Sequence, residues 1–220
     1  MAPGIESRAV RRHYAALARD YNAGANQACN RAYARLVRAA LADAQTVLEV
    51  GAGAHSLLGE LRAPLCVAAD ITPQMLRQLS ASDIRRVVCD GASPPFRHAS
   101  FDAVYSINVI EHVPDPRAFI SSCARLLRPG GRLLMVTPNG GVAALLEWIE
   151  RLKLKLPEGP HRFVTAQELQ AWAAEAGCEV AELSLMLALP AGPEPLVRGV
   201  DALACPLGFG LFLQALFIKR

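Results

Sequence analysis

Apolar and polar positions form two alternating kinds of segment through the middle of the chain. Short, mostly apolar runs predict buried strands at Thr46–Val50, Leu65–Ala69, Arg85–Cys89, Phe101–Ile107 and Arg132–Thr137. The segments between and after them predict helices at Ser56–Arg62, Pro73–Ser80, Pro116–Leu127 and Val142–Leu154. This alternation favours a parallel sheet with helices on both faces, and such sheets bind ligands at the carboxyl ends of their strands.

The two ends of the chain follow other patterns. Near the start, apolar residues at helical spacing predict two helices, Ser7–Asp20 and Asn26–Ala42. Near the end, Thr165 and Glu168 have the spacing of a capping box, and the helix that they begin stops at Gly177. The remaining expected elements are strands at Cys178–Leu187 and Phe209–Ile218 and a helix near Glu194–Ala204. We expect the two late strands to form an antiparallel pair at the edge of the sheet.

Length and composition fit one globular domain without a membrane span. The 220 residues are 52% hydrophobic, which is enough to fill one core. The longest apolar stretch, Gly199–Ile218, is interrupted by Asp201 and Pro206, so we expect no transmembrane segment. The six cysteines lie far apart and no pair has CxxC spacing, which predicts reduced thiols, a cytoplasmic location and no metal site.

Positive charge is concentrated near the start of the chain. Residues 1–40 hold seven arginines against Glu6 and Asp20, whereas the net charge of the whole chain is only +3. A segment of this kind can attract nucleic acid or the surface of an anionic membrane, as in a peripheral contact. The plainer interpretation is a solvated helix face, so the charge by itself assigns no partner.

A pair of glycines follows the first predicted strand. Gly51 and Gly53 are one residue apart, and glycine lets the backbone turn sharply and approach a ligand closely. A helix that begins after such a loop offers free N–H groups to an anionic group. The dinucleotide-binding pattern requires a third glycine where this chain has Ser56, so the pair alone is weak evidence.

Acidic side chains lie at the ends of three successive predicted strands. Glu49 ends the first, Asp70 follows the second and Asp90 follows the third. Because the carboxyl ends of parallel strands share one edge of a sheet, these side chains are expected to surround one ligand, and a carboxylate after the second strand can bind ribose hydroxyls. Together with the glycine pair, they predict a cofactor that carries a nucleoside.

These motifs match a known family in order. The matching blocks are VLEVGAGAHSLL, AADITPQML, CDGASPPFRHASFDAVYSINVIEHVPDP, CARLLRPGGRLLMVTPN and HRFVTAQELQAWAAEAGCEV. Over nearly its whole length the chain resembles the class I S-adenosylmethionine-dependent methyltransferases, in the small-molecule branch that includes the quinone-biosynthesis (type 11) enzymes. The resemblance implies an α/β, Rossmann-like methyltransferase fold, with a mostly parallel seven-stranded sheet, helices on both faces and an antiparallel edge pair. It also implies S-adenosylmethionine as the cofactor.

The resemblance assigns the cofactor contacts residue by residue. The expected cofactor-binding residues are Glu49, Gly51, Ala52, Gly53, Asp70, Ile71, Met75, Cys89, Asp90, Gly91, Asn108, Val109 and Tyr21. As in the family, Glu49 is expected beside the methionine half, Asp70 at the ribose and Asp90 at the adenine amino group. One position departs from the family, because His55 replaces the usual third glycine and is expected to alter access to the methionine carboxylate.

The same resemblance divides residues 1–220, which we expect to form a single domain. Residues 1–43 are expected to form a helical cap, 44–140 the cofactor-binding core, and 141–220 the helices and edge strands that line the acceptor pocket. The apolar segment Pro190–Pro206 in the last part predicts a small hydrophobic or aromatic acceptor that is methylated on oxygen or carbon. The chain is expected to be a monomer or a homodimer.

Two histidines are candidates for proton transfer. His112 directly follows the loop after the fourth predicted strand and is the candidate general base. His161, before the late helix, is a second candidate, and Tyr14 is a candidate to close the pocket from the first helix. Glu111 and His112 do not form a metal-binding pair, because no second histidine lies three or four residues away.

Other functions were compared with this one. A nicotinamide-dependent dehydrogenase would carry the full GxGxxG pattern, which fails at Ser56, and would lack the Asp90-Gly91 pair. An RNA- or protein-directed methyltransferase stays an alternative, although aromatic residues are only 6% and no appended RNA-binding domain fits, so nucleic acid is not the expected partner. A non-catalytic methyltransferase-like partner subunit is the other alternative, and only His55 points to it.

Overall fold

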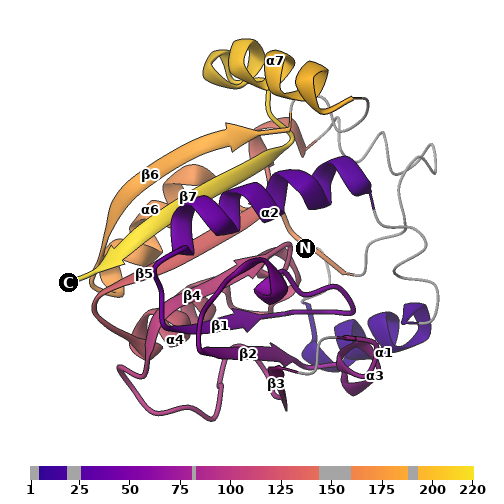
Figure 1. Ribbon diagram of the computed structural model, residues 1–220, viewed down its shortest axis with the longest axis vertical. Coiled ribbons are helices and arrows are strands. Elements are labelled where there is room, and N and C mark those ends of the chain that lie inside the picture. The colour runs from indigo at the N-terminus through magenta and orange to yellow at the C-terminus, as the bar shows by residue number, and fades with distance from the viewer. Residues whose placement is uncertain (1–4, 19–25, 81–82, 144–159, 188–192) are drawn as a thin grey trace.

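A seven-stranded sheet forms the centre of the molecule (Figure 1). The computed structural model describes residues 5–18, 26–80, 83–143, 160–187 and 193–220. The strands are β1 (Thr46–Val50), β2 (Leu65–Asp70), β3 (Ile84–Val88), β4 (Phe101–Ile107), β5 (Leu127–Pro138), β6 (Cys178–Met186) and β7 (Phe212–Lys219), in the order β3-β2-β1-β4-β5-β7-β6. β1 to β5 are parallel, and β7 is antiparallel to both β5 and β6. The predicted sheet with its antiparallel edge pair is therefore confirmed.

Helices cover both faces of this sheet. They are α1 (Ser7–Leu17), α2 (Gln27–Leu41), α3 (Pro73–Leu76), α4 (Pro116–Leu126), α6 (Ala166–Glu175) and α7 (Glu194–Ala204), with short 3-10 turns η1 (Leu58–Glu60), η2 (Ile110–His112), η3 (Gly140–Val142) and η4 (Cys205–Leu207). Most of the helix predicted at Val142–Leu154 lies outside the described residues. The last two residues of the helix predicted at Ser7–Asp20 lie outside them as well. None of the described helices is both long enough and apolar enough to cross a membrane.

Two predicted helices are much shorter than expected. The segment Ser56–Arg62 forms only the 3-10 turn η1, and Pro73–Ser80 forms only the single turn α3. The first prediction was wrong because the chain must return to the start of β2 almost at once. Leu61 is already extended, and Pro64 disfavours helical backbone at the residue before it. The glycine loop is therefore not followed by a full helix.

The core lies on both faces of the sheet, because the strands are apolar on both sides. On one face α4 and α6 pack with Phe119, Leu126 and Leu169 against the strands. On the other face α2 contributes Val37 and Leu41, both fully buried. The strand order reverses direction between β1 and β4, and at such a reversal the carboxyl ends of the strands leave a crevice for a ligand.

The predicted capping box of α6 is present and gives a test of stability. The Thr165 side chain accepts from the backbone N–H of Glu168, and the Glu168 carboxylate accepts from the backbone N–H of Thr165 at 2.9 Å. Thr165→Ala is expected to lower the free energy of unfolding by about 1 kcal/mol in urea titrations. Thr165→Ser keeps the hydroxyl and is the matched control. An unchanged stability in Thr165→Ala would show that packing alone holds α6.

Candidate functional site

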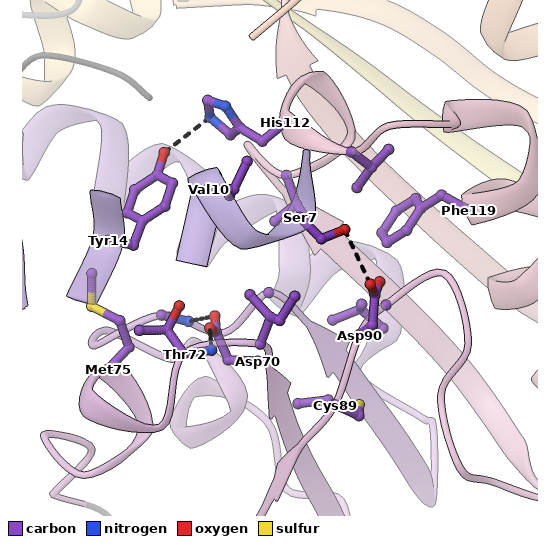
Figure 2. Close-up of a pocket in the computed structure, with 18 of the residues that line it drawn as sticks. Ser7, Val10, Tyr14, Asp70, Thr72, Met75, Cys89, Asp90, His112 and Phe119 are labelled. Carbon is purple, nitrogen blue, oxygen red and sulfur yellow. Dashed lines mark hydrogen bonds between the residues drawn. The ribbon is translucent and has the colours of Figure 1, made fainter. Parts of the chain in front are cut away.

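A cavity lies at the carboxyl ends of β1 to β4, and α1 covers it (Figure 2). Its volume is about 780 Å³, including its open mouth. Residues that sequence analysis predicted for the site and that line the cavity are Gly51, Gly53, Asp70, Ile71, Met75, Cys89, Asp90, Gly91, Asn108, Val109 and His112. These residues, which extend from position 51 to position 112 of the sequence, therefore line one cavity.

The glycine loop, residues 51–53, contributes Gly51 and Gly53 to the lining of the cavity. Its backbone conformation suits only glycine at these two positions. Gly51 and Gly53 have φ angles of 79° and 58°, in the left-handed region. A Cβ on Gly51 would lie 2.2 Å from Cγ2 of Val109, on the loop after β4. The backbone N–H of Gly51 donates to the carbonyl of Ala69 at 2.7 Å, which ties the loop to β2. The close approach to Val109 and the tie to β2 shape the floor of the cavity.

The Asp70 carboxylate is fixed at the end of β2. One oxygen accepts from the backbone N–H of Gly53 at 2.9 Å, and the other accepts from the backbone N–H of Thr72 at 2.7 Å. Burial raises its pKa above the ordinary value, although these hydrogen bonds oppose the shift. Each carboxylate oxygen has a second lone pair, so Asp70 keeps the capacity to accept from hydroxyls in the cavity.

The Asp90 carboxylate stands at the opposite end of the cavity from His112 (Figure 2). Its Oδ1 accepts from the backbone N–H of Ala92 at 2.9 Å, and its Oδ2 accepts from the hydroxyl of Ser7, on α1, at 3.2 Å. Beside it, a Cβ on Gly91 would lie 2.6 Å from the ring of Phe119. A glycine at position 91 therefore leaves room for the aromatic ring at the cavity wall.

Glu49, on β1, and Ala52, in the glycine loop, do not line the cavity. Both are 4% exposed. The hydroxyl of Ser56 donates a hydrogen bond to the Glu49 carboxylate. Burial is the largest influence on this carboxyl and raises its pKa from 4.5 to about 7. Through its hydrogen bond with Ser56, Glu49 connects the end of β1 to the residues that follow the glycine loop. Tyr21, also predicted for the site, lies outside the described residues.

Asn108 carries a polar atom that the described protein leaves unsatisfied. Its backbone has a φ of 54°, and its Nδ2 donates to the hydroxyl of the buried Tyr33 at 3.2 Å. Its Oδ1 is buried without a hydrogen-bond partner among the described residues. An orphaned acceptor on the wall of a cavity fits a ligand that brings a donor.

His112 is held in one tautomer by two hydrogen bonds. The side chain is buried; its Nδ1 lies 3.0 Å from the carbonyl oxygen of Pro160 and its Nε2 lies 3.0 Å from the hydroxyl of Tyr14. Because a carbonyl only accepts, Nδ1 carries the hydrogen, and the lone pair of Nε2 faces Tyr14. Oε1 of the buried Glu111 lies 4.0 Å from the same Nε2. Nε2 can therefore act as a proton acceptor.

Two other candidates for the pocket, His161 and α7, lie outside the wall of this cavity. His161 is absent from the cavity wall, and its ring lies edge-on to His112 with centroids 6.1 Å apart. α7, from the segment expected to line the acceptor pocket, contributes no residue to this cavity, because its Val197 is buried in the core beside α2 and its Glu194 binds Arg35 of α2 at 2.7 Å. Figure 1 shows α7 at the other end of the molecule from α1 and α3.

The cavity also has residues that sequence reasoning did not single out. Ser7 and Val10 reach it from α1, Thr72 from the start of α3, and Phe119 from α4. The helical spacing of Val10 and Tyr14 was visible in the sequence, but it did not say against which element α1 packs. His55 is exposed, and since the turn η1 replaces the expected helix, no helix N-terminus follows the glycine loop.

Comparison with known proteins agrees with this geometry. The family model of a methyltransferase domain matches residues 21–183. The ubiquinone biosynthesis O-methyltransferase of Xanthomonas axonopodis pv. citri is 36% identical over 163 residues, which are 66% of this chain and 66% of that protein. The chain thus spans just under two thirds of the length of such relatives.

Solved structures share the fold at low sequence identity. A SAM-dependent methyltransferase from Thermotoga maritima superposes with a TM-score of 0.71 at 17% identity, covering 96% of this chain and all of the other. Geranyl diphosphate C-methyltransferase from Streptomyces coelicolor, solved with S-adenosyl-L-homocysteine, has a TM-score of 0.61 at 16% identity, covering 87% of this chain and 79% of the other. Because the family model matches residues 21–183, the chain belongs to the methyltransferase domain family. Its predicted class, the class I S-adenosylmethionine-dependent methyltransferases, is confirmed, and S-adenosylmethionine is the cofactor of that class.

The raised pKa of Glu49 predicts a pH dependence of stability. The folded state holds the proton of this carboxyl more tightly than the unfolded state, so its contribution to stability is fully present below pH 4.5 and is lost as the pH rises through about 7. Glu49→Gln stays neutral and is expected to be more stable than the wild type at pH 8, by on the order of 3 kcal/mol. Urea unfolding between pH 4.5 and 8 measures the difference, and the two proteins should converge at the acid end. A less stable variant at pH 8 would contradict this account.

Proposed function

We propose that this chain transfers a methyl group from S-adenosylmethionine to a hydroxyl of a small apolar or aromatic acceptor, with His112 as general base. The observation that carries the proposal is the proton-accepting Nε2 of His112 on the wall of the cavity that also contains Asp70 and Asp90. A base is useful only when the acceptor must lose a proton, so this arrangement favours a hydroxyl over a neutral amine.

The residues present fit the cofactor. Asp70 has spare acceptor capacity for the ribose hydroxyls, and Asp90 for the adenine amino group. The unsatisfied Oδ1 of Asn108 suits the ammonium group of the methionine half, and Met75 and Ile71 offer apolar contact to the adenine. When bound, the cofactor supplies a methyl group on a positively charged sulfur. The chain itself has to orient the acceptor and exclude water around that methyl group.

His112 acts on the proton of the acceptor. Its Nδ1–H is held by the Pro160 carbonyl, so the ring is oriented with Nε2 toward the hydroxyl of Tyr14, another residue of the cavity wall. Nε2 takes the proton as the acceptor oxygen attacks, and the nearby carboxylate of Glu111 stabilises the imidazolium that forms. His161 packs behind His112 and serves to position it.

The acceptor is proposed to be apolar because several of the side chains that line the cavity are apolar. Val109, Val113 and Phe119 line it together with Val10 from α1. Burial of such surface contributes about 25 cal/mol per Å². A relative is named for O-methylation in ubiquinone biosynthesis, which agrees with a ring hydroxyl as the target. With residues 1–43 as the cap and 44–140 as the cofactor-binding core, one domain carries the reaction; we also propose a cytoplasmic monomer or homodimer.

Asp70→Ala tests the cofactor site. The variant removes a charged hydrogen-bond acceptor and is expected to weaken binding of S-adenosylhomocysteine by about 1–3 kcal/mol in isothermal titration. Asp43 is exposed and precedes β1, so it lies at the opposite edge of the sheet from the cavity. Asp43→Ala is the control and should bind S-adenosylhomocysteine as the wild type does. Equal affinities of Asp70→Ala and the wild type would place the ribose elsewhere.

His112→Gln tests the base. With catechol as the probe acceptor and mass spectrometry to detect one added methyl group, turnover is expected to fall by about 10²–10⁴-fold. Binding of S-adenosylhomocysteine should stay within error of the wild type. The exposed His98 provides a matched control, because His98→Gln should keep full turnover. Wild-type turnover in His112→Gln would remove His112 from the mechanism.

A further inference from the structure

α1 faces the cavity with three side chains on one side of the helix. Ser7, Val10 and Tyr14 line the cavity, whereas Arg8, Arg11 and Arg12 are exposed. Figure 2 shows α1 lying across the cavity, with Ser7 pointing to Asp90 and Tyr14 pointing to His112. Tyr14 is seven positions after Ser7 in the helix, roughly 10 Å along the helix axis. One rigid element therefore contacts both ends of the site.

Each of these two contacts occupies a group that the proposed reaction needs. The Ser7 hydroxyl donates to Asp90 at 3.2 Å, and the Tyr14 hydroxyl lies 3.0 Å from Nε2 of His112. The ring of Tyr14 packs against Ala18, Ala54 and Met75. Because α1 is continuous from Ser7 to Leu17, a shift that breaks one contact also strains the other.

The contact at His112 is exclusive. A neutral imidazole has one unprotonated nitrogen with one lone pair, and here that nitrogen is Nε2, since Nδ1–H points to Pro160. The hydroxyl of Tyr14 and the hydroxyl of an acceptor therefore compete for the same lone pair. As long as Tyr14 stays in place, the base cannot take a proton from the acceptor.

We propose that Tyr14 is a positioning residue that keeps His112 out of the reaction until the cofactor displaces α1. This inference rests on the proposed function of His112 as the base. The adenine amino group needs the space beside the Asp90 carboxylate that the Ser7 hydroxyl fills, and the displacement of α1 at that end withdraws Tyr14 from Nε2 at the other. Binding of the cofactor thereby frees the base, and the acceptor hydroxyl takes the place of the Tyr14 hydroxyl.

Cofactor affinity is the first test, because it does not depend on turnover. Tyr14→Phe lacks the hydrogen bond that must break, so it should bind S-adenosylhomocysteine about 2- to 10-fold more tightly than the wild type in isothermal titration. Ser7→Ala should bind more tightly for the same reason, and it checks the idea if Tyr14→Phe folds poorly. Val10→Ala, on the same face without a hydrogen bond, is the control for lost packing. Unchanged or weaker binding in both Tyr14→Phe and Ser7→Ala overturns the proposal.

The protonation pattern of His112 is the second test. In protein with ¹⁵N-labelled histidine, the Nε2 resonance of the wild type should move on addition of S-adenosylhomocysteine toward its position in ligand-free Tyr14→Phe. With catechol as acceptor, Tyr14→Phe should have a lower KM for catechol and an undiminished kcat. A kcat as low as that of His112→Gln would make Tyr14 a proton relay and overturn the proposal. If His112→Gln keeps its turnover, the proposed function fails, while the affinity and ¹⁵N results still judge the contact of α1.

Discussion

The carboxylate of Asp70 connects the two loops that shape the cavity. It accepts one backbone N–H from the loop after β1 and another from the loop after β2, at Gly53 and Thr72. The strands alone do not determine how these two loops turn. The two hydrogen bonds to Asp70 therefore help to set the distance between the glycine loop and the loop after β2. Hydrogen bonds to a buried charged group are stronger than those in water, and their loss would leave two N–H donors without partners. Together with the hydrogen bond from Gly51 to Ala69, this side chain fixes the glycine loop against the end of β2 and the start of α3.

Most of the sheet could be predicted because its strands are buried on both faces. β1 and β4 begin and end at the predicted residues, since their apolar runs are bounded by polar or glycine positions. β5 begins earlier than expected, at Leu127, because Arg128-Pro129-Gly130-Gly131 reads as a turn in sequence but continues the strand after a register shift. The helix after the glycine loop was predicted from the alternation of short apolar runs with longer segments, and the short return to β2 did not leave room for it.

The site was predictable where it is made of strand ends and unpredictable where it is made of docked elements. Asp70, Asp90 and Asn108 follow strands, so the order of strands in the sheet brings them together. The partners of His112 are 98 residues before it, at Tyr14, and 48 residues after it, at Pro160, and no local pattern encodes such contacts. Glu49 lies two positions before the glycine loop, but its carboxylate accepts a hydrogen bond from Ser56, which occupies the third-glycine position of the dinucleotide-binding pattern. The motif alone did not predict this contact.

The place of β7 in the sheet has a consequence for the order of folding. β7 comes last among the strands but lies between β5 and β6, so β6 has no neighbour to pair with until β7 is in place. The five parallel strands, by contrast, follow one another between positions 46 and 138 and can assemble as the chain leaves the ribosome. The half of the sheet that surrounds the cavity can therefore pair before the chain is complete, whereas the antiparallel edge requires β7, the last strand.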